Sequence, residues 1–237
     1  LDFYFKACSI RITAKDLAAI GFVLANRGRL PQSGERAFPG QYARYVNAEK
    51  GIGCDLTVLS CEGWKPHLYY DETDLLWVNP SPNIPTVNCA INYIGSCIYE
   101  ATNLSEGRGT TRPFDWLGAP FVDEQSLLRD MNALSLPGVT FRAMTFTPMF
   151  NKHAGQTCRG LELHITDRDA YRPFETMLHM FRHFKKYPAF EMKQNGLALR
   201  LGQDILTGDF DPALVARKAA EDSRRFCEIV EKYRLYA

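Results

Sequence analysis

The sequence predicts a fold that combines helices and strands, of the α/β class with α+β as the open alternative. Residues 139–146 and 160–166 predict strands, and the second of these alternates apolar with polar side chains. Residues 173–186 carry apolar side chains at helical spacing. The 237 residues, 46% of them hydrophobic and 23% charged, suit one large globular domain or two small ones. We therefore predict a mixed sheet with flanking helices.

The first part of the chain is predicted to contain two helices and one strand. A helix is expected over residues 13–26, with a capping pair at its start and a glycine after its end. Residues 28–40 predict a loop, and residues 41–49 a short helix. Residues 54–61 predict a strand that is buried on both faces.

Prolines and capping residues define the elements that follow. Residues 77–85 contain three prolines within six residues, which predicts a stiff, extended path. Thr86 can then cap a short helix that runs to Ile94. A further helix is predicted over residues 123–134. The last predicted helix starts at Asp211 and Pro212 and runs to about Tyr233. The residues expected to face inward on the last helix are Ala219, Phe226, Ile229 and Tyr233.

Charge and cysteine content exclude several classes of protein. The net charge of +1 gives no indication of a nucleic-acid binder or a polybasic membrane surface. No apolar run approaches the roughly 20 residues that a membrane helix needs, and no signal peptide is visible after Leu1. The seven cysteines include no C-x-x-C pair, so we expect mainly free, buried thiols and no zinc site.

The segment from Tyr99 to Phe114 is the densest group of polar residues in the chain. Glu100 and Glu106 could form the pair of carboxyl groups that glycoside hydrolysis requires, although two such glutamates can equally be solvated. Arg108, which lies between two glycines, could bind a ligand carboxylate through two hydrogen bonds or tie down its own loop. Asn103 and the Thr110–Thr111 pair are further candidates for holding a substrate.

The histidines are weaker candidates. His179 and His183 have the i, i+4 spacing of metal ligands on a helix, but they lie opposite its apolar stripe, so we expect exposed side chains. His153 and His164 could line a cleft or be structural. A nucleophilic pair of Cys158 with His164 lacks a third orienting group.

The chain resembles the bacterial exo-β-N-acetylmuramidase family. The resemblance rests on residues 77–85, 97–114 and 118–120, above all on the string Glu-x-Thr-Asn-x-Ser-x-Gly-Arg-Gly-Thr, and extends over roughly residues 40–237. Ala101 stands where the family usually has glycine. The resemblance implies a Rossmann-like N-terminal domain, a smaller C-terminal domain, and an active cleft between them. It also implies release of N-acetylmuramic acid (MurNAc) from the non-reducing end of peptidoglycan fragments.

These observations define the predicted site and domain organisation. The predicted catalytic residues are Glu100 and Glu106, and the predicted substrate-binding residues are Asn103, Ser105, Arg108, Thr110, Thr111 and Asn83. The resemblance gives Arg108 a partner in the lactyl carboxylate of MurNAc. Residues 1–40 are predicted to be a remnant or edge of the Rossmann-like region, and residues 41–237 the C-terminal domain. No metal or cofactor is predicted.

The expected partners are muropeptides, and the expected location is the periplasm or the exterior of the cell. The alternative function is a non-catalytic peptidoglycan- or carbohydrate-binding protein with an incomplete active site.

Overall fold

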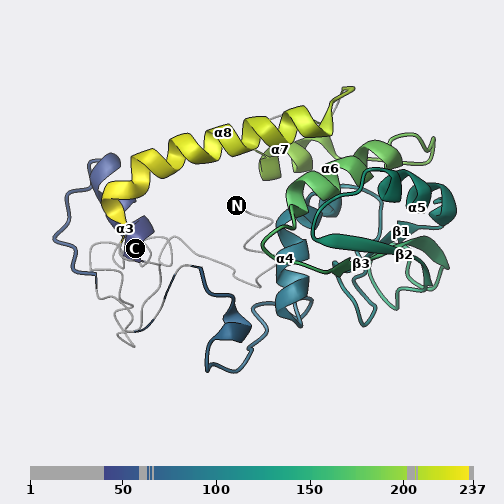
Figure 1. The fold of residues 1–237 in the computed structure, drawn as a ribbon, viewed down its shortest axis with the longest axis horizontal. Helices are drawn as coiled ribbons and strands as arrows, with labels where there is room; N and C mark the ends of the chain where they lie inside the picture. Colours follow the sequence, from purple (N-terminus) through teal and green to yellow (C-terminus); the bar gives the residue numbers. More distant parts are fainter. Residues whose placement is uncertain are drawn as a thin grey trace, which may run out of the picture. The chain divides into compact units, whose positions relative to one another are not determined.

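A computed structural model describes residues 40–58, 63, 65, 67–201, 206 and 208–234 (Figure 1). The chain divides into two compact units, one made of Leu1–Leu68 with Ser223–Ala237 and the other of Tyr69–Asp222. The helix expected over residues 13–26 and the loop that follows it lie outside the described residues. Within the described residues, no helix is long and apolar enough to span a bilayer.

The unit Tyr69–Asp222 contains a three-stranded antiparallel sheet. Its strands are β1 (Trp116–Ala119), β2 (Val139–Phe146) and β3 (Cys158–Ile165), in the spatial order β1-β3-β2. β3 pairs with β1 and with β2, for example Gly160 with Gly118 and Leu163 with Phe141. The two predicted strands are confirmed as β2 and β3, and the prediction of a combined helix-and-strand fold is confirmed. Both strand pairings are antiparallel, as is typical of sheets in α+β folds.

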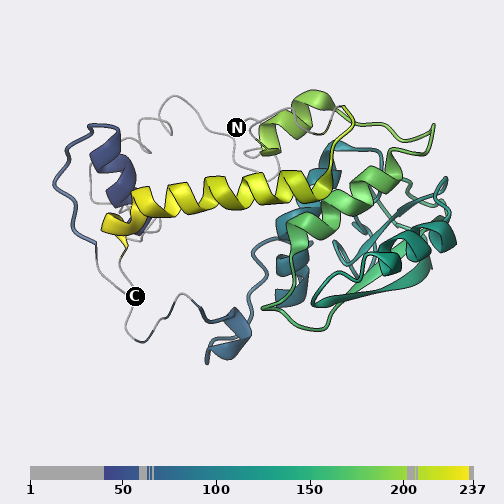
Figure 2. The ribbon, with the colours of Figure 1, turned by 45° about the horizontal axis from the view of Figure 1, so that its top comes forward.

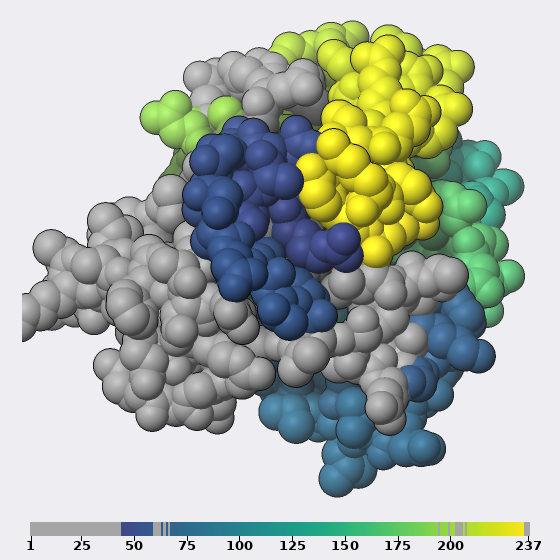
Figure 3. Space-filling model, turned by 90° about the vertical axis from the view of Figure 1, so that its left-hand side faces the viewer, coloured from purple at the N-terminus to yellow at the C-terminus, as the bar shows by residue number. Residues whose placement is uncertain are grey.

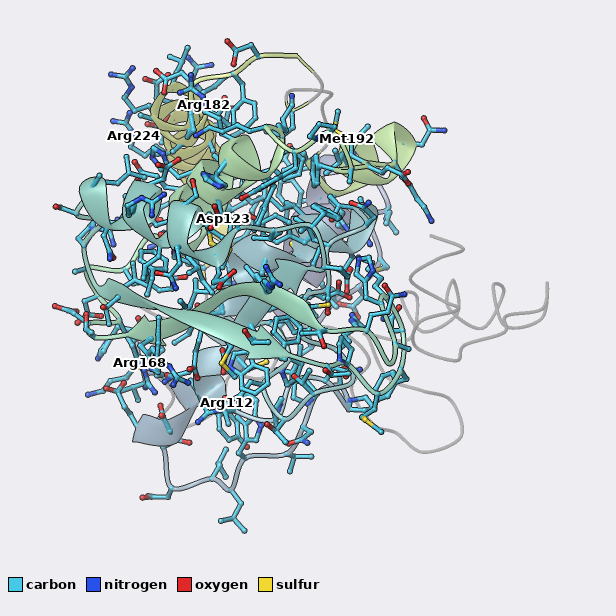
Figure 4. The ribbon with its side chains drawn as sticks, turned by 90° about the vertical axis from the view of Figure 1, so that its right-hand side faces the viewer. Arg112, Asp123, Arg168, Arg182, Met192 and Arg224 are labelled. Atoms are coloured by element: carbon cyan, nitrogen blue, oxygen red, sulfur yellow. The ribbon has the colours of Figure 1, made fainter. Side chains whose placement is uncertain are left out.

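Three predicted helices pack around this sheet. α4 (Val87–Ser96) is capped by the Thr86 side chain, which accepts a hydrogen bond from the backbone of Cys89. α5 (Glu124–Ala133) is capped by Asp123 in the same way, and α6 is Pro173–Phe184. α5 packs against β2, β3 and α6, and α6 packs against α4. In Figure 4, Asp123 at the start of α5 lies on one side of the sheet, and Arg112 and Arg168 lie on the other.

The core of this unit combines aromatic and aliphatic side chains from all these elements. The largest fully buried side chains are Tyr99, Phe114, Phe181, Phe184, Ile98, Leu104, Leu117, Leu127, Met131, Leu161, Met177 and Leu178. Two short elements complete this part of the unit: a 3-10 helix, η2 (Cys97–Ala101), directly follows α4, and α7 (Gln194–Leu201) packs against it. The segment around η2 is thereby fixed between the core and α7.

A buried network of polar groups crosses the same core. Asn92 of α4 donates from Nδ2 to Oδ1 of Asp115 at 2.8 Å, and its own Oδ1 accepts from the Tyr171 hydroxyl at 2.8 Å. All three residues are buried, and burial raises the pKa of the Asp115 carboxyl above its usual range. Asn92 therefore satisfies two polar groups that have little access to water.

An ion pair holds the segment before α4 to the rest of the unit. A 3-10 helix, η1 (Tyr70–Glu72), presents Asp71 to Arg168, whose guanidinium donates to both carboxylate oxygens at 2.7 Å. Arg168 also donates to Asn88 and lies over the Tyr69 ring at 5.1 Å. This contact ties the start of the unit to the loop after β3.

The last helix, α8 (Pro212–Val230), begins in one unit and ends in the other (Figure 2). Asp211 caps its first turn by accepting from the backbone of Ala213, which confirms the predicted start. The predicted inward positions of Phe226 and Ile229 are wrong, because these side chains are 42% and 49% exposed. Phe226 contacts only one ring, Tyr45, among the described aromatic residues.

The unit that contains both chain ends includes α3 (Gly40–Glu49), which confirms the helix predicted there. A short 3-10 helix, η3 (Glu231–Tyr233), follows α8. The ring of Tyr45 meets the ring of Tyr233 edge-on at 5.8 Å, and Lys232 Nζ lies 2.8 Å from Glu49 Oε1. Figure 3 shows α3 beside the end of α8.

Two further predictions were wrong, for identifiable reasons. Residues 54–58 of the predicted strand 54–61 form no strand, and at Cys54 the side chain of Asn47, not a partner strand, bonds both the N–H and the C=O. His183 is buried and not exposed, because Asp130 and Tyr187 of neighbouring segments supply partners for its two ring nitrogens. The thiols of Cys89, Cys97, Cys158 and Cys227 are free, and of the described cysteines only Cys89 and Cys158 are buried.

Candidate active site

Glu100 is placed by the turn that ends α4. It lies in η2, whose neighbouring side chains Ile98 and Tyr99 are anchored in the core. One oxygen of its carboxylate pairs with Arg108, and the other lies 2.9 Å from a terminal nitrogen of Arg200 on α7. The Glu100 side chain is 11% exposed. Two guanidiniums thus flank one carboxylate near the protein surface.

Glu106 is the second carboxylate of this group, and it is more deeply buried. Its Oε1 lies 3.1 Å from Nε of Arg108, and its Oε2 lies 2.9 Å from Nζ of Lys152. Although the Arg108 Nε is within ion-pair distance, its N–H direction does not meet the requirements of a hydrogen bond. We call Glu100, Glu106, Arg108, Lys152 and Arg200 the ionic cluster. Arg108 is its centre, because it pairs with both carboxylates.

Two glycines allow the backbone on either side of Arg108 to pack closely. Gly107 and Gly109 both have positive φ, 73° and 83°. A Cβ at Gly107 would meet the carbonyl oxygen of Arg112 at 2.7 Å, and one at Gly109 would meet that of Phe150 at 2.6 Å. These glycines are therefore required by contacts within the protein. They leave the guanidinium of Arg108 over the ring of Phe114, 5.1 Å from its centroid.

The connection between β2 and β3 brings Lys152 to the cluster. Asn151 and His153 on either side of it have positive φ, 72° and 57°, which is uncommon for residues other than glycine. Between them, Lys152 donates to Glu106 and, at 2.8 Å, to the backbone carbonyl of Tyr99. Burial lowers the pKa of the Lys152 ammonium group, and the charge of Glu106 opposes that shift.

The predicted substrate-binding residues have mixed surroundings. Asn103 uses its amide within the protein, donating to the carbonyl of Ala189 and accepting from the N–H of Glu191. Ser105 is buried and accepts from the N–H of Gly107. The hydroxyl of Thr110 donates to the carbonyl of Gly107 at 2.6 Å. These three side chains therefore stabilise the loop that carries Arg108.

The remaining two candidates are not joined to the ionic cluster. Thr111 is exposed next to the loop. Asn83 lies before α4, where its backbone carbonyl accepts from the thiol of Cys89. Among the described residues, no hydrogen bond or ion pair links either side chain to the cluster.

Three residues of this region were not predicted as site residues. Lys152 and Arg200 reach the cluster from other elements, and His153, left open in the sequence, contacts the Asn103 carbonyl through Nε2 at 2.6 Å. The sequence signal for Lys152 is its place between two residues that tolerate a left-handed backbone, Asn151 and His153. Arg200 lies on α7, a helix that was not predicted, and has no such signal.

The cluster joins three cationic side chains to two carboxylates, all mostly shielded from water. The Tyr93 ring packs edge-on against Phe114 at 4.8 Å. Burial raises the pKa of the Tyr93 hydroxyl, and the negative charge of Glu100 adds to this effect. A guanidinium such as that of Arg108 can bind a carboxylate through two hydrogen bonds.

No metal-binding group is evident in the part of the chain that the structure describes, where no set of three His, Cys, Asp or Glu side chains is suitably placed. The proposed pairing of Cys158 with His164 is also not formed. The two residues lie at different positions of β3, where Cys158 is buried and His164 is exposed beside Glu162.

Family models match separate parts of the chain. The model for the C-terminal region of the exo-β-N-acetylmuramidase NamZ matches residues 91–236, and the model for its N-terminal region matches residues 38–88. The glutaminase model matches residues 1–49. The chain thus joins segments similar to two families, and the matches overlap in the region of α3.

Curated relatives give the same division. The peptidoglycan β-N-acetylmuramidase NamZ of Bacillus subtilis (strain 168) is 46% identical over 143 residues, which are 60% of this chain and 34% of that protein. Glutaminase 1 of Clostridium perfringens (strain 13 / Type A) is 54% identical over 48 residues, or 20% of this chain and 16% of the glutaminase. The chain therefore matches about a third of the length of the muramidase.

Solved structures share the fold. A DUF1343 family protein from Bacteroides fragilis NCTC 9343 is 26% identical with a TM-score of 0.68, and the match covers 84% of this chain and 56% of that one. A second DUF1343 family protein from the same organism, 21% identical with a TM-score of 0.61, supports the fold alone. The match over residues 91–236 includes all five members of the ionic cluster, and this chain belongs to the exo-β-N-acetylmuramidase family.

Proposed function

We propose that this protein is an exo-acting glycoside hydrolase that releases MurNAc from the non-reducing end of peptidoglycan fragments. The observation that carries the proposal is the ionic cluster, in which two carboxylates meet three cations, inside residues 91–236, which match the model for the C-terminal region of the muramidase NamZ. Glycosidases use paired carboxyl groups as acid and as base or nucleophile. MurNAc adds a carboxylate of its own, which suits the guanidinium of Arg108.

We assign the roles of acid and of base or nucleophile to Glu100 and Glu106, and the lactyl carboxylate of MurNAc to Arg108. Asn103, Ser105 and Thr110 support the loop that carries Arg108, while Thr111 and Asn83 remain candidates for contacts with the rest of the sugar. Because peptidoglycan lies outside the cytoplasmic membrane, we propose that the protein acts in the periplasm or outside the cell. Cell fractionation tests this, and recovery in the cytoplasm alone would contradict it.

The test of function is hydrolysis of a chromogenic β-MurNAc glycoside by the protein. Glu100→Gln and Glu106→Gln are each expected to lower kcat by about 100-fold or more, because general acid or base catalysis contributes at least that factor. The matched control is Glu221→Gln, which changes an exposed glutamate of α8 and leaves kcat unaltered.

Two other outcomes have definite meanings. Hydrolysis that is equally fast in wild type and in both cluster variants removes these two residues from the mechanism. Binding of MurNAc without any hydrolysis supports the alternative, a non-catalytic peptidoglycan-binding protein. No glutaminase activity is proposed, because the match to the glutaminase covers 16% of that protein.

A further inference from the structure

Each carboxylate of the ionic cluster has two cationic partners, and one of these partners is shared. Glu100 contacts Arg108 and Arg200, whereas Glu106 contacts Arg108 and Lys152. If Arg108 turned away, Glu100 would keep Arg200 at 2.9 Å and Glu106 would keep Lys152 at 2.9 Å. Arg108 can thus move away while each carboxylate keeps one cationic partner. A buried carboxylate with no cationic partner would be strongly destabilising.

The surroundings of Arg108 also distinguish it from the other two cations. Its side chain is 26% exposed, compared with 21% for Lys152 and 15% for Arg200. Its Nε is buried and, among the described residues, makes no hydrogen bond. Arg108 is therefore both the most accessible cation of the cluster and one whose hydrogen-bonding capacity is not fully used.

Lys152, by contrast, is fixed at both ends of its side chain. Its backbone lies between the left-handed residues Asn151 and His153, and its ammonium group bonds the backbone carbonyl of Tyr99 as well as Glu106. The connection between β2 and β3, which carries Lys152, also contacts the loop that carries Arg108, because the N–H of Met149 donates to the carbonyl of Gly109 at 2.8 Å. Lys152 is held in place whether or not Arg108 moves.

We propose that Lys152 is a positioning residue that neutralises Glu106, so that Arg108 can leave Glu106 and bind a carboxylate on the ligand. The ligand class is a sugar that carries one carboxylate. Its identification as MurNAc rests on the proposed function. Lys152 does not touch the ligand in this proposal and acts through Glu106.

The experiment compares the binding of MurNAc with that of N-acetylglucosamine, which lacks the lactyl carboxylate, by isothermal titration calorimetry. In Lys152→Met, Arg108 becomes the only cation beside Glu106, so we expect the preference for MurNAc to fall about tenfold, equivalent to about 1.4 kcal/mol. The matched control is Lys186→Met, which removes the lysine of an ion pair with Asp130 on α5, and it leaves the preference unchanged.

A second variant separates positioning from a merely structural role. Glu106→Gln removes the charge that would retain Arg108, so Lys152→Met combined with Glu106→Gln is expected to regain the MurNAc preference of Glu106→Gln alone. Circular dichroism of each variant checks that it is folded. A loss of binding that is equal for both sugars, or a double variant no better than Lys152→Met, overturns the proposal.

The same measurements distinguish this inference from the proposed function. A protein that prefers MurNAc in a Lys152-dependent way but releases no sugar supports the positioning role and contradicts the hydrolase. Hydrolysis of the MurNAc glycoside together with an unchanged MurNAc preference in Lys152→Met supports the hydrolase and contradicts the positioning role. Absence of any preference for MurNAc in the unaltered protein also overturns the positioning role.

Discussion

The ionic cluster and the network of Asn92, Asp115 and Tyr171 solve the same problem differently. Both remove carboxyl groups from water within one unit of the chain. In the network, Asp115 is 6% exposed, its carboxyl accepts a hydrogen bond from a neutral amide, and Arg112, its one cation among the described residues, lies 3.8 Å away, while burial raises the pKa of Asp115. In the cluster, two carboxylates contact three cations that are between 15% and 26% exposed. The network completes the core, whereas the cluster includes cationic side chains that are partly exposed.

The largest expected effect on stability comes from breaking the core network. Asn92→Ala leaves the Asp115 carboxyl and the Tyr171 hydroxyl without their shared partner, so the free energy of unfolding should fall by about 3 kcal/mol. Urea denaturation followed by circular dichroism measures this change. The control is Asn132→Ala on an exposed turn of α5, expected within about 0.5 kcal/mol of wild type. A comparable loss in both variants would show that the network has no special role.

A smaller effect is expected from removing the centre of the cluster. In Arg108→Gln, Lys152 and Arg200 still pair with the two carboxylates, so the free energy of unfolding should change by less than about 1 kcal/mol, as for partly exposed ion pairs. The preference for MurNAc over N-acetylglucosamine should be lost in the same variant. Destabilisation as large as that of Asn92→Ala would show that the cluster contributes as much to stability as the core network.

The smallest effect concerns how stability depends on pH. The raised pKa of Asp115 means that the folded protein binds a proton more tightly there than the unfolded chain does. Its contribution is therefore fully present below the unfolded value of about 4 and declines as pH rises through the folded value. Relative to wild type, Asp115→Asn should gain stability as pH rises from about 4 to about 7, because asparagine has no carboxyl group that loses a proton. Unfolding free energies across that range test the sign, and a constant difference would contradict it.

The sequence predicted the starts of helices, which depend on signals within a few residues. Thr86, Asp123 and Asp211 each cap the helix expected after them, because a capping side chain acts within three residues of its own position. β1 was not predicted, since it has four residues and follows Phe114 in a left-handed conformation. Of the strand expected over residues 54–61, the described residues 54–58 form none, and the side chain of Asn47 bonds the N–H and the C=O of Cys54.

The candidate site was predicted only where its residues are close in sequence. Glu100, Glu106 and Arg108 lie in one short segment, and the structure brings them together. Lys152 is 46 residues from Glu106, and Arg200 is 100 residues from Glu100, so neither could be paired with its carboxylate by local spacing. Asn103 was predicted to face a substrate, but its amide bonds the backbone of residues 189–191.

The connection between β2 and β3 has a consequence for engineering and for dynamics. Loops at the tip of a hairpin ordinarily accept inserted residues and exchange their amide hydrogens quickly. Here the N–H of Met149 bonds Gly109, and the N–H of Gly155 bonds Pro148 at 2.8 Å. These two amides should therefore resist deuterium uptake despite their position at a loop. We expect a peptide tag inserted after Lys152 to disrupt this arrangement and separate Lys152 from Glu106.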